Sequence, residues 1–175
     1  QLVERVLRRA SCSEQLETGV AVAAVREGLR RHRAGTRAHP GHGRSGVERL
    51  RLDGDADVLI VCVPTPIDKA KVPDLSPVVA AAELILTGLR PGQLVVLQST
   101  TYPGTTTGPF RAVLERGGLV AGRDFDLAYA PERINPGDPA TASKDVPRLV
   151  GATTPAATAR AAGLLRRIND DVREL

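Results

Sequence analysis

The chain has 175 residues, of which 42% are hydrophobic and 2% aromatic, with a formal net charge of +4. This amount of apolar material predicts one domain, whose core must be built from Val, Leu, Ile and Ala because Trp and Met are absent. No apolar run approaches the roughly 20 residues of a membrane span, and no signal-peptide pattern opens the chain. We therefore expect a soluble, cytoplasmic protein with no membrane partner.

Residues 1–51 carry the basic charge, with 11 Arg and 5 Glu, whereas residues 52–175 hold 13 basic and 15 acidic side chains. The pattern of residues 1–33 predicts a helix with a loose apolar face between Val20 and Leu29. Residues 34–46 are rich in Gly, Arg and His and predict a loop or disorder. The composition of residues 30–50 fits either a divergent native segment or a shifted reading frame in a GC-rich gene. We assign residues 1–50 to an atypical Arg-rich segment and residues 51–175 to an α/β domain.

From residue 57 onward the pattern changes to alternating strands and helices. Strands are predicted over residues 58–63, 94–97, 125–130 and 148–150, and helices over residues 76–87, 105–115 and 154–168. The strands are continuous apolar runs, which are typical of strands buried on both faces of a parallel sheet. Ser76 is expected to cap the first of these helices. The alternation predicts βαβ units and an α/β fold with a parallel sheet and flanking helices.

Each of the first three predicted strands of this domain ends in a loop rich in polar residues or proline. Pro64, Thr65 and Pro66 follow the first strand, and their prolines stop it from continuing. Residues 99–105, Ser-Thr-Thr-Tyr-Pro-Gly-Thr, follow the second, and residues 131–137, Pro-Glu-Arg-Ile-Asn-Pro-Gly, follow the third. Ligands of open parallel sheets bind beyond the carboxyl ends of the strands, so we expect these loops to converge on one site.

The side chains of these loops have two open interpretations. Thr65 and the hydroxyls of residues 99–102 suit a cofactor or an anionic group, or else they only shape a strand exit and cap a helix. Glu132 suits a base or water-orienting group and Arg133 a phosphate or carboxylate clamp, or else both pair at the surface. The two cysteines, Cys12 and Cys62, predict no disulfide framework and no metal site, and Cys62 is interpreted as a core residue.

Taken together, these motifs resemble the amino-terminal domain of the UDP-glucose/GDP-mannose dehydrogenase family, the NAD-dependent nucleotide-sugar 6-dehydrogenases. The resemblance rests on residues 62–66, Cys-Val-Pro-Thr-Pro, on residues 73–76, Pro-Asp-Leu-Ser, and on residues 99–106 and 129–137. It covers about residues 55–165, so we expect a fragment of a family member. The Pro-Glu-Arg form is more similar to the branch acting on UDP-GlcNAc or UDP-ManNAc than to the UDP-glucose branch.

The resemblance implies a Rossmann-like sheet and a two-step oxidation of the sugar C6 alcohol to a carboxylate, with two NAD reduced per turnover. It implies that Thr100 positions the catalytic water and that Glu132 acts at the sugar as a base or water-orienting group. The residues implied to contact NAD are Pro64, Thr65, Ser99 and Thr100, and those implied to lie at the UDP-sugar are Glu132, Arg133 and Asn135. The UDP-glucose branch has a second Glu where this chain has Pro136, so any role of that Glu is not transferred.

The family's first strand and its Gly-x-Gly-x-x-Gly turn are not found in context. Gly41, Gly43 and Gly46 have the spacing, but no strand pattern precedes them, and we interpret the match as chance. The first βαβ unit is therefore absent or replaced by a mostly helical segment. The lost strand is central in the doubly wound order, so residues 1–33 must cover the bare edge with helices, or the chain associates.

Family members also use a cysteine of a later domain and dimerise through parts outside this chain, so an oligomer is expected only for the full-length protein. Two alternatives remain open. One is a non-catalytic interaction module with a basic N-terminal helix, which salt-dependent binding to unrelated DNA would favour, although no nucleic-acid motif is present. The other is a different NAD-dependent dehydrogenase of the same fold.

We expect this chain alone to turn over no nucleotide sugar, because the later cysteine domain is missing from it. The measurement is NADH absorbance after mixing the chain with NAD and UDP-GlcNAc or UDP-ManNAc. Steady production of NADH would contradict the expectation.

Overall fold

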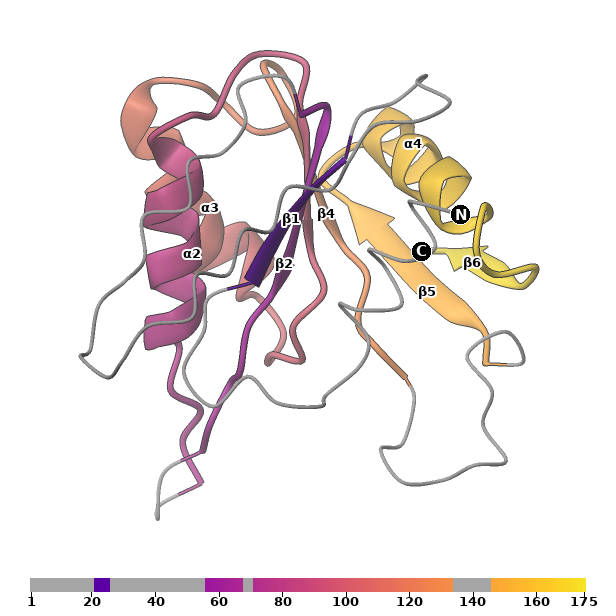
Figure 1. Cartoon of the computed structure of the whole chain (residues 1–175), viewed down its shortest axis with the longest axis horizontal. Helices are drawn as coiled ribbons and strands as arrows, with labels where there is room; N and C mark the ends of the chain where they lie inside the picture. The colour runs from indigo at the N-terminus through magenta and orange to yellow at the C-terminus, as the bar shows by residue number, and fades with distance from the viewer. Residues whose placement is uncertain (1–20, 26–55, 68–70, 134–145) are drawn as a thin grey trace, which may run out of the picture.

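The computed structural model describes residues 21–25, 56–67, 71–133 and 146–175. In this part of the chain six strands form a sheet in the order β1 to β6, flanked by helices (Figure 1). The strands are β1 Ala21–Val25, β2 Val58–Cys62, β3 Leu94–Leu97, β4 Asp126–Tyr129, β5 Arg148–Ala152 and β6 Val172–Glu174. The helices are α2 Ser76–Leu86, a π-helical turn Thr106–Phe110, α3 Arg111–Leu114, a 3-10 turn Glu115–Gly117 and α4 Pro155–Leu165.

Strands β2, β3 and β4 are parallel and form the centre of the sheet. Their registers align Val58 with Leu94 and Leu94 with Asp126, so the three strands begin and end at the same levels. All four residues of β3 are buried, as are the first four of β2. The predicted buried strands of a Rossmann-like parallel sheet are therefore confirmed.

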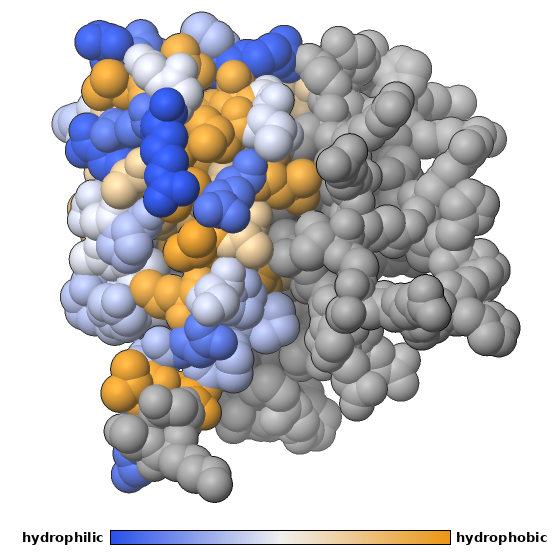
Figure 2. Space-filling view, turned by 90° about the vertical axis from the view of Figure 1, so that its left-hand side faces the viewer, coloured by the Kyte–Doolittle hydropathy of each residue, from blue (hydrophilic) through white to orange (hydrophobic). Residues whose placement is uncertain are grey.

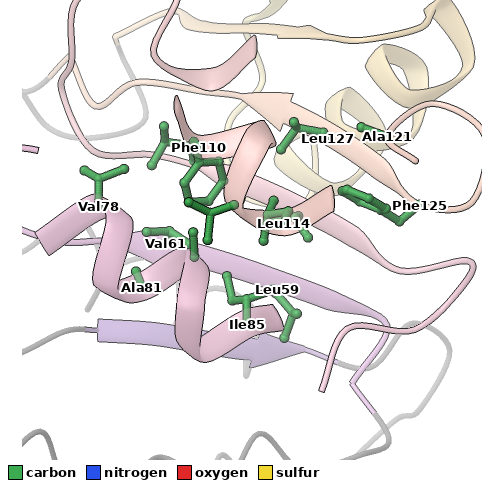
Figure 3. Close-up of a cluster of buried hydrophobic side chains, with 14 of the residues drawn as sticks. Leu59, Val61, Val78, Ala81, Ile85, Phe110, Leu114, Ala121, Phe125 and Leu127 are labelled. Atoms are coloured by element: carbon green, nitrogen blue, oxygen red, sulfur yellow. The ribbon is translucent and has the colours of Figure 1, made fainter. Parts of the chain in front are cut away.

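Helices cover both faces of this sheet, with α2 and α3 on one side and α4 on the other (Figure 1). On the first side, Val78 and Ile85 of α2 pack with Leu59 and Val61 of β2, and Phe110 completes the cluster (Figure 3). On the other side, the alternate residues of the strands pack on α4 in a second cluster. No helix in the described part of the chain is long and apolar enough to cross a membrane.

Two predicted helix details need correction. Ser76 is the first residue of α2 and not its cap, which is Leu75. The Ser76 N–H donates to Oδ1 of Asp74 at 2.8 Å, and the hydrogen bonds with Ser76 lower the pKa of Asp74. The helix predicted over residues 105–115 is interrupted, because Gly108 has non-helical angles (φ −100, ψ −106) and Pro109 has no N–H to donate. A π-helical turn therefore precedes the short α3.

The outer strands differ in direction from the prediction of an entirely parallel sheet. β5 is antiparallel to β4, with Tyr129 opposite Gly151, while β6 is parallel to β5. A parallel neighbour needs a long crossover, usually a helix, and residues 131–147 carry no helical pattern. An antiparallel return has no such requirement, which explains the direction of β5.

Strand β1 also differs from the prediction, because residues 21–25 were expected to be helical and form a strand instead. It pairs antiparallel with β2, placing Ala21 opposite Cys62 and Val25 opposite Val58. The edge of β2 is apolar and would otherwise leave its backbone groups unpaired, and a short Ala/Val segment can satisfy it as a strand. The edge is thus covered by a strand rather than by helices. The remaining predictions for residues 1–20 and 26–55 lie outside the described residues.

We predict that Ala21→Cys forms a disulfide with Cys62 in a Cys12→Ser background under oxidising conditions. Directly opposed residues of antiparallel strands have Cβ atoms about 4.5–5.5 Å apart, close to what a disulfide requires. Non-reducing electrophoresis and peptide mapping measure the link. Val22→Cys is the control, since its register position opposes Val61 on the other face of the pleat and should give no link. Linking by Val22→Cys instead of Ala21→Cys would contradict the register.

Candidate functional site

The loops after β2 and β3 are joined to each other by two hydrogen bonds at the carboxyl edge of the sheet. The Thr65 hydroxyl donates to the Thr100 carbonyl oxygen at 2.7 Å. The Val63 N–H donates to the Ser99 hydroxyl oxygen at 2.8 Å, and this bond is buried. The two loops are therefore held against each other by hydrogen bonds.

The loop after β4 joins the same edge. The Thr101 N–H approaches the Tyr129 hydroxyl oxygen at 3.4 Å, which connects the second loop to the end of β4. Glu132 follows β4 and forms an ion pair with Arg148 of β5, with 2.6 Å between Oε2 and Nη1. The predicted convergence of the three loops on one edge is confirmed.

The predicted site residues are unequally accessible within this edge. Pro64 and Thr100 are exposed, Thr65 and Glu132 are partly buried, and Arg133 is exposed. Ser99 is buried, with its hydroxyl occupied as an acceptor for a backbone N–H. Asn135 lies outside the described residues. The structure thus brings Thr65 and Thr100 together, and the individual roles of all these residues stay predictions.

Cys62 lies at the end of β2, on the face of the sheet that packs against α4. Its thiol donates to the Gln98 side-chain oxygen at 3.2 Å. Burial, together with the nearby Glu132 carboxylate, raises the pKa of Cys62 to about 12, and the Arg148 guanidinium acts in the opposite direction. A thiol with this pKa is not ionised near neutral pH, so Cys62 is a packing residue rather than a nucleophile.

Arg148 and Gln98 also belong to this edge, although neither was predicted from the sequence. Arg148 is buried although it begins an apolar strand, and Gln98 is buried directly after β3. A charged residue in an otherwise apolar predicted strand is a signal that could have drawn attention to Arg148, because arginine is rarely buried without a partner. Gln98 carries no comparable signal in the sequence.

The loop between β2 and α2 projects beyond the sheet edge (Figure 1). Ile67 pairs with Pro73 across this loop, and both Ile67 and Val72 are exposed. The space-filling view shows this projection as a small hydrophobic protrusion at the foot of the molecule (Figure 2). In the described segments no group of three His, Cys, Asp or Glu residues is arranged to hold a metal ion.

Comparison with known proteins gives a family for most of this chain. Residues 50–169 match the UDP-glucose/GDP-mannose dehydrogenase family, NAD binding domain. Among curated relatives, the UDP-N-acetyl-D-glucosamine 6-dehydrogenase of Pseudomonas aeruginosa is 45% identical over 100 residues, covering 57% of this chain and 24% of that protein. Protein CapL of Staphylococcus aureus has the same identity and coverage. The chain therefore spans about a quarter of the length of these relatives.

Solved structures agree with this family. The NDP-N-acetyl-D-galactosaminuronic acid dehydrogenase of Methanosarcina mazei Go1 superposes with a TM-score of 0.64 at 35% identity, covering 69% of this chain and 26% of that one. A GDP-mannose dehydrogenase from Pseudomonas aeruginosa, at 22% identity and a TM-score of 0.64, shares the fold. These matches confirm the predicted family resemblance, the Rossmann-like fold and NAD as the cofactor of the family.

We predict that Ser99→Ala lowers the free energy of unfolding by about 1–3 kcal/mol, because the buried Val63 N–H loses its acceptor. Urea denaturation followed by circular dichroism measures the change. Thr107→Ala is the control at an exposed position of the π-helical turn that follows this loop, and it should change stability by less than about 0.5 kcal/mol. Equal stabilities of the two variants would show that the Ser99 hydroxyl does not hold the two loops together.

Proposed function

Because the chain belongs to the UDP-glucose/GDP-mannose dehydrogenase family through its NAD-binding domain, we propose that it carries the catalytic edge of a UDP-N-acetylhexosamine 6-dehydrogenase. The substrate class proposed for the whole protein is UDP-GlcNAc or UDP-ManNAc, and its proposed location is the cytoplasm. The observation that supports this proposal is the joining of the loops that hold Thr65, Thr100 and Glu132 at one edge.

The described residues offer contacts for NAD in the loops after β2 and β3, but β1 offers no phosphate-binding turn. The exposed Thr100 and the partly buried Thr65 offer polar groups beyond the strand ends, where a Rossmann sheet binds its cofactor. The glycine-rich turn of such a sheet follows the carboxyl end of the central strand, at that same edge. Here β1 runs antiparallel, so its carboxyl end at Val25 lies beside Val58, at the opposite edge. β1 therefore does not supply the phosphate-binding turn, and Gly41, Gly43 and Gly46 lie outside the described residues.

Bound NAD would supply the hydride acceptor for both oxidation steps of the family reaction. In our proposal the residues of this chain bind and orient the other reactants. The Thr65 hydroxyl is committed to the Thr100 carbonyl, which fixes the backbone of Thr100 and thereby the position of its hydroxyl. Thr100 is proposed to position the catalytic water, and the Glu132 carboxylate is proposed to orient that water or to accept a proton at the sugar. Arg133 and Asn135 are proposed to contact the UDP-sugar.

We expect UDP-GlcNAc to bind this edge of the isolated chain and to shift the amide resonances of residues 64–65, 99–101 and 131–133. The physical reason is that these backbone segments hold the residues proposed to contact the reactants and lie at the same edge of the sheet. Titration of the ¹⁵N-labelled chain with UDP-GlcNAc measures the shifts and the dissociation constant.

Glu132→Gln should weaken this binding about tenfold, in keeping with the loss of a hydrogen bond to a charged group. Glu115→Gln is the matched control, because Glu115 is a partly buried carboxylate that also pairs with an arginine, at 2.7 Å from Arg111, but lies after α3 away from the edge. Absence of binding to a folded chain, or resonance shifts confined to other segments, would contradict the proposed function.

A further inference from the structure

Arg148 has an unusual position for a charged residue. It is the first residue of β5, and among the described residues it is the one charged side chain in the buried class. Its place follows from the antiparallel register of β4 and β5, in which Tyr129 lies opposite Gly151. Continued by three residues, that register brings Glu132 opposite Arg148, and the two side chains form the ion pair described above.

The burial of this pair separates it from the other ion pairs of the described surface. The Arg148 side chain is 5% exposed and that of Glu132 is 20% exposed, whereas Arg166 and Glu174 are 50% and 38% exposed. Exposed pairs contribute little to stability, but a buried guanidinium costs several kcal/mol in desolvation that only a close partner offsets. Replacement of such a pair by apolar residues is often neutral for stability, so stability alone does not account for it.

Both oxygens of the Glu132 carboxylate are engaged. Oε2 contacts Nη1 of Arg148 at 2.6 Å, and Oε1 accepts the Arg133 N–H at 2.8 Å. The Arg148 contact is an ion pair without hydrogen-bond geometry and restrains the carboxylate by charge, while the Arg133 N–H holds the other oxygen by a hydrogen bond.

We propose that Arg148 is a positioning residue that fixes the orientation of the Glu132 carboxylate for the UDP-sugar. This inference rests on the proposed function, because it assigns Arg148 a role through Glu132 and no contact with the substrate. If Arg148 were merely structural, its replacement would change substrate binding to the same extent whether residue 132 is Glu or Gln. The two roles therefore differ in how substitutions at the two positions combine.

Cys62 supplies a first test that needs no ligand, because both charges act on its thiol. The rate of alkylation at fixed pH follows the thiolate fraction, measured by mass spectrometry in a Cys12→Ser background. Glu132→Gln should speed alkylation and Arg148→Met should slow it, because the carboxylate raises the pKa of the thiol and the guanidinium lowers it. The double variant should return near the parent rate. Local unfolding would speed alkylation in both single variants, so opposite signs identify the charge effect.

Binding of UDP-GlcNAc supplies the second test, through a double-mutant cycle. Arg148→Met should weaken binding about tenfold in the parent chain and less than about twofold in the Glu132→Gln background, because the effect passes through the carboxylate. Arg148→Lys keeps a charge at this position and should recover part of the affinity. Circular dichroism establishes that each variant is folded. Arg148→Lys keeps a cation beside Glu132, and the double variant removes both charges, so neither variant leaves an unpaired buried charge.

Equal weakening by Arg148→Met in both backgrounds would overturn the positioning role, as would alkylation rates that do not respond to either substitution. If the parent chain binds no UDP-GlcNAc, the proposed function fails, and the alkylation test still decides whether the charges of Glu132 and Arg148 both lie beside Cys62. Opposite alkylation shifts together with a non-additive binding cycle are the results that we expect.

Discussion

The in-register pairing of the three parallel strands is the constraint on which the rest of the structure depends. Val58, Leu94 and Asp126 stand side by side, so β2, β3 and β4 end together and release their loops at one edge. The Thr65–Thr100 and Val63–Ser99 hydrogen bonds form only because the strands end at matching levels. A displacement of one strand by a single residue would also move each side chain to the opposite face of the sheet, so the two buried clusters under the helices hold this register.

The two outer sides of this centre serve different purposes. On one side, antiparallel β5 brings Arg148 back to the edge, where it meets Glu132. On the other side, antiparallel β1 covers the apolar edge of β2 but has its carboxyl end at the opposite edge of the sheet. The three central strands are therefore flanked by an antiparallel strand on each side. Among the described residues, the proposed cofactor site is formed by the loops after β2, β3 and β4 alone.

Local patterns predicted the central strands well. The apolar run of residues 94–97 was predicted as a buried strand and forms β3. Residues 21–25 were predicted as helix because a short Ala/Val run fits either structure, and the bare edge of β2, a tertiary feature, decides for a strand. Convergence of the loops followed from strand direction. The ion pair of Glu132 with Arg148 could not be predicted in this way. It depends on the antiparallel direction of β5, for which residues 131–147 carry no local sequence signal.

The most direct test of this account compares NAD with nicotinamide mononucleotide by isothermal titration into the folded, monodisperse chain. The cofactor contacts are proposed at the loops after β2 and β3, and β1 supplies no phosphate-binding turn. We therefore predict that NAD binds no more than about threefold more tightly than the mononucleotide, a difference below about 1 kcal/mol. Binding of NAD about a hundredfold or more tightly would contradict this prediction, because the adenylate half would then have a site of its own.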